Sequence, residues 1–159
     1  MKLNLSKIAS ILALAAILTI PAFAAEKEGK VKVGPTDGRL ITSVTPHAEF
    51  LVTKDKKVEI RFVDSANKVV APGEQEVLVT LGERSKPTKL TFTKEGNKLV
   101  SSGPIPAGND YPTVVQIRAK AGAKPVNEKF NLNLEKCPTC KYQEYNCICD
   151  HAADEKKKK

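Results

Sequence analysis

The sequence predicts an all-β protein, an immunoglobulin-like or Greek-key antiparallel β-sandwich, and three observations support this fold class. Apolar and polar residues alternate in short runs, most strictly in residues 130–134, FNLNL. Clusters of Gly, Pro, Asn and Asp separate these runs at intervals of roughly 8–15 residues, as in proteins built from short antiparallel strands. After residue 24 no segment shows the 3.6-residue apolar periodicity of an amphipathic helix.

Each alternating run predicts one strand, with its apolar residues on a buried face and its polar residues in water. Two antiparallel sheets packed face to face would bury these apolar faces, and a closed barrel is the alternative. The predicted strands lie near residues 39–44, 48–53, 58–64, 76–81, 88–93, 98–102, 113–120 and 128–134.

The predicted strands carry no recognisable catalytic set, so we expect no enzymatic activity. The only histidine among them is His47, which we interpret as a partly exposed residue at a strand edge rather than as a metal ligand. We expect the acidic residues Asp37, Glu49, Asp55 and Glu59 to be solvated, because they fall in turns and on outward-facing strand positions.

The first 24 residues have the composition of a secretory signal peptide. Lys2 and Lys7 precede an apolar run over residues 8–20, and Ala22-Phe23-Ala24 offers small residues for cleavage. The run is shorter than the ~20 residues that span a bilayer, so we expect cleavage and no stable membrane insertion. The mature chain is therefore predicted to be soluble and periplasmic or secreted.

The sequence suggests a single folded domain with polar ends. Residues 1–24 form the signal peptide, 25–33 an N-terminal arm, 34–134 the β-sandwich, 135–151 a cysteine-rich knuckle and 152–159 a disordered charged tail. The formal net charge is +8, yet aromatic residues make up only 5% of the chain, with no Trp. A basic face with interleaved aromatics is missing, so we expect no nucleic-acid partner.

All four cysteines lie within 13 residues, in the segment CPTCKYQEYNCICDH. Cys137 and Cys140 form a C-x2-C pair, and Cys147 and Cys149 form a C-x-C pair followed by His151. Four thiolates around one point suit tetrahedral Zn²⁺, and two or three suit Cu(I). We therefore predict a metal site made of these four cysteines, in which His151 could replace one of them.

Two other interpretations of this segment stay open. An exported protein with an even number of cysteines often oxidises them, and four cysteines allow three pairings, so the domain could be a disulfide-stapled protein-interaction module without metal. A thiol oxidoreductase using Cys137 and Cys140 is less favoured, because the βαβ context of such motifs is missing. Tyr142 and Tyr145 are expected to cover the knuckle.

The stretch GPTDGRLITSVTPHAEFLVTKDKKVEIRFVD, residues 34–64, resembles small exported all-β domains seen alone or joined to periplasmic adaptor subunits of heavy-metal efflux pumps. The Pro-containing loops at 71–73 and 103–108 fit the same pattern. The resemblance implies a non-enzymatic, accessory or metal-binding role beside an envelope efflux or adaptor protein. Related domains often have histidine where Thr36 stands, and Met1 is the only methionine, so a Met/His copper site is not expected.

Overall fold

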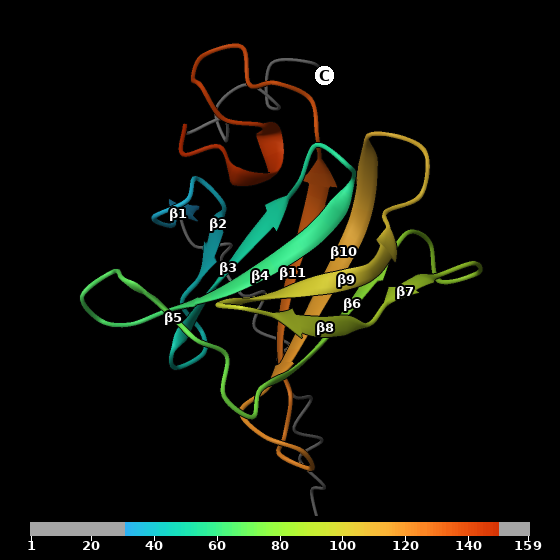
Figure 1. Cartoon of the computed structure of the whole chain (residues 1–159). Coiled ribbons are helices and arrows are strands. Elements are labelled where there is room, and N and C mark those ends of the chain that lie inside the picture. Colours follow the sequence, from blue (N-terminus) through green and yellow to red (C-terminus); the bar gives the residue numbers. More distant parts are fainter. Residues whose placement is uncertain (1–30, 150–159) are drawn as a thin grey trace, which may run out of the picture.

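The computed structural model describes residues 31–149, and in this range the chain forms two antiparallel β-sheets (Figure 1). In spatial order the first sheet contains β1 (Lys32–Val33), β2 (Arg39–Ile41), β3 (His47–Val52), β4 (Lys57–Val63), β9 (Lys98–Pro104) and β8 (Phe92–Glu95), with β5 (Val69–Val70) paired to β4. The second sheet contains β11 (Val126–Asn133), β10 (Asp110–Arg118), β6 (Glu76–Leu81) and β7 (Thr88–Leu90). We call these two sheets and their connections the two-sheet body.

One hydrophobic core lies between the sheets, as the alternation predicted. The first sheet contributes Phe50 and Phe62, and the second contributes Val115 and Leu132; all four side chains are fully buried. Burying a side chain of this size contributes about 1.5–3 kcal/mol. The all-β prediction is confirmed and the arrangement is consistent with a β-sandwich, whereas the immunoglobulin-like or Greek-key topology stays a prediction.

The prediction of one strand over residues 88–93 is wrong. Leu90 ends β7 and pairs with Val79 of the second sheet, whereas Phe92 begins β8 and pairs with Ser101 of the first sheet. The chain therefore changes sheet at Thr91. Leu90 and Phe92 still pack on the same core from opposite sides, which explains why their spacing resembled that of a single strand.

Glu49 is not solvated, contrary to the expectation from its outward-facing position. Its side chain is fully buried, because the loop between β1 and β2 (residues 34–38) folds over it. The carboxylate oxygen Oε1 accepts hydrogen bonds from the backbone N–H of Thr36, at 2.9 Å, and of Gly38, at 2.7 Å. A side chain at Gly34 or Gly38 would collide with Glu49, so these glycines allow the loop to cover the carboxylate.

Glu59 is likewise buried, although solvation was expected. Its carboxylate lies 2.6 Å from the guanidinium of Arg61 and 2.5 Å from the ammonium of Lys98. A buried carboxylate requires such partners, because an unpaired charge away from water is strongly unfavourable. The alternation of the strand correctly placed Glu59 on the outer face but could not show that neighbouring side chains cover that face.

Candidate metal centre

The described part of the cysteine knuckle, residues 135–149, is a compact turn at one end of the two-sheet body (Figure 1). Its backbone folds back on itself through two hydrogen bonds of 2.9 Å, from the N–H of Cys137 to the carbonyl of Tyr142 and from the N–H of Glu144 to the carbonyl of Glu135. This reversal, followed by the short helix η1 (Glu144–Asn146), brings the second cysteine pair back to the first. Among residues 31–149 no helix is long and apolar enough to span a membrane.

Tyr145 anchors the knuckle to the two-sheet body. Its ring packs edge-on against Phe50 at 6.0 Å between centroids, and its hydroxyl oxygen accepts a 3.3 Å hydrogen bond from the backbone N–H of Val52. Burial raises the pKa of the Tyr145 phenol, the Val52 N–H opposes this, and the charge of Glu49 adds to it. Tyr145 was expected to cover the knuckle, but its side chain instead enters the hydrophobic core.

Polar contacts join the knuckle to the β1–β2 loop and to β2. The side-chain amide of Asn146 donates to the carbonyl of Asp37 at 2.5 Å, and the guanidinium of Arg39 donates to the carbonyl of Tyr145 at 3.1 Å. Lys141 lies 3.2 Å from the Asp37 carboxylate, but both side chains are well exposed, so this ion pair adds little stability. The knuckle is thus held by buried contacts of η1.

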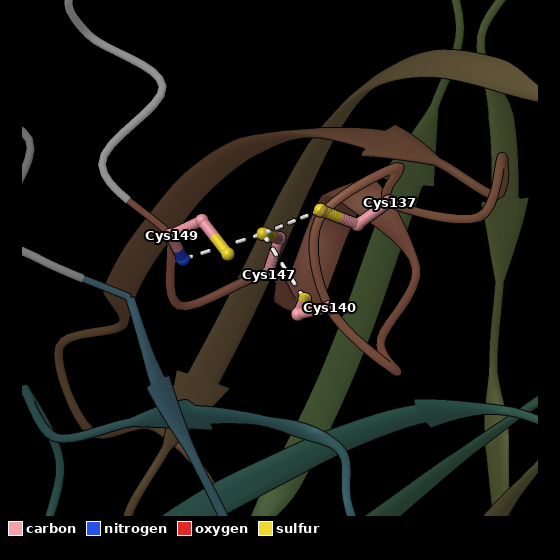
Figure 2. Close-up of side chains that lie close together, drawn as sticks. All are labelled: Cys137, Cys140, Cys147 and Cys149. Atoms are coloured by element: carbon pink, nitrogen blue, oxygen red, sulfur yellow. Dashed lines mark hydrogen bonds between the residues drawn. The ribbon is translucent and has the colours of Figure 1, made fainter.

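The four cysteine sulfurs converge (Figure 2). The four Sγ atoms all lie within 4.8 Å of one another. Cys147 Sγ is 3.2 Å from Cys137 Sγ and 3.5 Å from Cys140 Sγ. Four thiolates at 2.3 Å around a tetrahedral Zn²⁺ would be about 3.8 Å apart, so the observed spacing is close to that of a metal site. None of the four cysteines forms a disulfide.

A hydroxyl group and a backbone amide also contact the sulfurs. Thr139 Oγ1 lies 3.2 Å from Cys137 Sγ and donates a hydrogen bond to Cys149 Sγ at 3.1 Å. The backbone N–H of Cys149 donates to Cys147 Sγ at 3.3 Å. Such outer contacts orient metal ligands and stabilise thiolate charge. Thr139 was not among the predicted site residues, although a hydroxyl between two cysteines of a C-x2-C pair was a usable signal.

The thiols at the centre of the cluster favour the protonated state. Burial raises the pKa of Cys147 far above its usual range, and neighbouring sulfurs add to this, while the N–H of Cys149 opposes it. For Cys140, a backbone hydrogen bond from Tyr142 lowers the pKa, but burial and the thiols of Cys137 and Cys149 raise it on balance. A bound cation would be needed to hold these sulfurs as thiolates at neutral pH.

Neither histidine belongs to the described cluster. His151 lies outside the described residues, so its predicted role as a substitute ligand stays a prediction. The Nδ1–H of His47 donates to the carbonyl of Val44 at 2.9 Å. Within residues 31–149 the cysteine cluster is the one group of three or more Cys, His, Asp or Glu side chains with donor atoms close enough to hold an ion.

Comparison with known proteins identified no relative. No family model matches the chain, no curated protein is significantly similar to it in sequence, and no solved structure matches its fold.

Proposed function

We propose that the protein is a non-enzymatic metal-binding protein that holds one soft or borderline ion between Cys137, Cys140, Cys147 and Cys149. The observation that carries this proposal is the convergence within 4.8 Å of four cysteine sulfurs that form no disulfide, each of which can supply one ligand. The two-sheet body serves as the scaffold, because η1 fixes the second cysteine pair through Tyr145 and Asn146.

Zn²⁺ and Cu(I) are the two ions that the donor set favours. Four thiolates arranged around one point suit tetrahedral Zn²⁺. The short contacts that join Cys147 to Cys137 and to Cys140 also define a three-sulfur group, and two or three thiolates suit Cu(I). Oxygen-preferring ions such as Mg²⁺ and Ca²⁺ do not fit this set of sulfur donors.

We propose that the protein is exported and sequesters or delivers its metal near an efflux system. The signal-like composition of residues 1–24 supports export, although these residues lie outside the described range. The resemblance of residues 34–64 to domains that accompany efflux adaptors supports an envelope efflux or adaptor protein as partner. In such a compartment a bound ion would also keep the four thiols reduced.

The second candidate function is a protein-interaction module without metal. One observation favours it: Cys147 Sγ lies 3.2 Å from Cys137 Sγ, so a small movement would bring these atoms to the 2.03–2.05 Å of a disulfide. Oxidation would then leave the sheet edges as the surfaces available to a partner. A thiol oxidoreductase remains the least favoured reading, because the residues 31–149 include no helix longer than η1 to activate a cysteine at its N-terminus.

Loading the protein with Co²⁺ in place of Zn²⁺ tests the proposed ligands. We expect intense sulfur-to-cobalt charge-transfer absorption together with visible bands of tetrahedral Co²⁺, saturating at one ion per chain. Zn²⁺ should abolish these bands by displacing Co²⁺. Weak bands typical of octahedral oxygen or nitrogen ligation would contradict the proposal.

Metal affinity should fall as the pH falls. Cys140 and Cys147 have raised pKa values in the metal-free protein, so both are protonated at neutral pH and must release a proton to bind. Protons therefore compete with metal. Because two protons are released, the Zn²⁺ affinity should decrease by at least about 100-fold per pH unit below pH 7. Competition with a chromophoric chelator at several pH values measures this dependence, after correction for the chelator's own protonation. A pH-independent affinity would exclude these thiols as ligands.

A further inference from the structure

The cysteine cluster has a buried side and an accessible side. Cys137 and Cys147 are only 2% and 5% exposed, whereas Cys140 and Cys149 are partly exposed. Cys147 occupies the middle of the cluster in Figure 2, with Cys149 on the opposite side of it from Cys137. An ion bound here would be held from within by two buried sulfurs and could be approached on the side of Cys140 and Cys149.

Cys140 is the more firmly fixed of the two accessible ligands. It lies inside the turn that the hydrogen bond from Cys137 N–H to the Tyr142 carbonyl closes at 2.9 Å, and Pro138 restricts the same turn. Its sulfur is 3.5 Å from Cys147 Sγ. The backbone on both sides of this sulfur is therefore fixed by the turn.

Cys149 is held differently. It follows Ile148, whose side chain is 46% exposed. Its backbone N–H bonds to Cys147 Sγ at 3.3 Å, which fixes the main chain, while its own Sγ accepts the 3.1 Å hydrogen bond from the hydroxyl of Thr139. Thr139 is itself exposed. A rotation of the Cys149 side chain could therefore release its sulfur without disturbing the turn around Cys140.

We propose that Cys149 is the exchangeable ligand and that Thr139 is a positioning residue that holds the Cys149 sulfur on the ion. This inference rests on the metal-binding function proposed above. The ion leaves on this side, by ligand exchange with a thiol-bearing acceptor. Cys137, Cys140 and Cys147 retain the ion until the acceptor has bound.

The exchange step needs no oxidant or reductant. The acceptor thiol loses its proton to solvent, and its sulfur donates an electron pair to form a new metal–sulfur bond. The bond between the metal and Cys149 Sγ breaks, its electron pair stays on that sulfur, and the released thiolate takes up a proton from solvent. The charge and oxidation state of the ion do not change.

Limited alkylation of the Zn²⁺-loaded full chain tests which ligand exchanges. Under limiting iodoacetamide, peptide mass spectrometry should show Cys149 modified at least about 10-fold faster than Cys137, Cys140 and Cys147. Coordination ties up the electron pair of a thiolate, so the sulfur that leaves the ion most often reacts fastest. Modification of Cys137, Cys140 or Cys147 as fast as Cys149 would overturn the proposal. A chain that binds no Zn²⁺ would instead refute the metal-binding function itself, so the two failures are distinguishable.

Substitutions of Thr139 test its positioning role. We expect Thr139→Val to raise the second-order rate constant for Zn²⁺ transfer to dithiothreitol by about 10-fold, because outer contacts of metal ligands typically have effects of this size. Thr139→Ser keeps the hydroxyl and should restore the rate of the unmodified protein. An unchanged rate in Thr139→Val, or equal rates in both variants, would contradict the role of the hydroxyl.

A second acceptor distinguishes the source of the incoming thiol. A metal-free peptide with a Cys-x2-Cys pair replaces dithiothreitol at the same thiol concentration. Transfer that increases in proportion to acceptor concentration supports ligand exchange for either acceptor, and the faster one indicates whether a protein or a small thiol fits the site. Transfer that does not depend on acceptor concentration would show that the ion dissociates first, which contradicts exchange at Cys149.

Discussion

The variant Cys147→Ser is expected to abolish stoichiometric metal binding. Cys147 Sγ occupies the centre of the cluster, 3.2 Å from Cys137 Sγ and 3.5 Å from Cys140 Sγ, and its side chain is almost fully buried. Water cannot easily replace a ligand at such a position. We expect the Zn²⁺ affinity to fall by more than about 100-fold, since changes in outer contacts alone cost about 10- to 100-fold. Chelator competition at pH 7 measures the loss.

Ile148→Ser is the matched control for this variant. It places the same new side chain at the next residue, which is 46% exposed and supplies no sulfur. We expect it to bind one Zn²⁺ with the affinity of the unmodified protein. Equal losses in both variants would mean that serine disturbs the knuckle rather than the ligand set. An unchanged Zn²⁺ affinity in Cys147→Ser would show that Cys147 is not a metal ligand.

The variant Tyr145→Ala is expected to detach the knuckle from the two-sheet body. The Tyr145 ring is 2% exposed and packs against Phe50, and truncating a buried aromatic side chain typically costs about 3–5 kcal/mol. The backbone N–H groups of Cys137 and Glu144, which are hydrogen-bonded inside the knuckle, should then exchange with solvent more than about 100-fold faster. Hydrogen exchange of the metal-free protein measures this change.

Tyr145→Phe separates the ring from the hydroxyl. It keeps the packing against Phe50 and removes only the acceptor of the 3.3 Å hydrogen bond from Val52 N–H. We expect a cost of about 1 kcal/mol and nearly normal protection of the knuckle. Unchanged exchange rates in Tyr145→Ala would show that the knuckle is held by its polar contacts to Asp37 and Arg39 instead.

Local alternation predicted much of the two-sheet body, because a period of two places every second residue in the core. The signal failed where residues two positions apart belong to strands of opposite sheets and pack on the same core, as Leu90 and Phe92 do. It also missed β1, since a pairing of two residues is too short to show a period. The burial of Glu49 depends on a loop that folds over it, which strand periodicity does not report.

The candidate site could be predicted from the spacing of the cysteines alone, because cysteines so close in sequence can converge regardless of how the two-sheet body folds. The spacing predicted the ligand set, and the structure brings the four sulfurs together. It did not predict how the knuckle is held, since Tyr145 contacts residues almost a hundred positions away in the sequence. Nor did it predict that the cluster has a buried and an accessible side, which depends on how η1 docks.

The most direct measurement counts zinc, copper and free thiols on one sample of the protein purified without reductant. We expect about one Zn or Cu ion per chain and four thiols that become titratable once the ion has been removed. A metal-free protein whose intact mass is lower by four hydrogens, with no titratable thiol, would contradict this expectation.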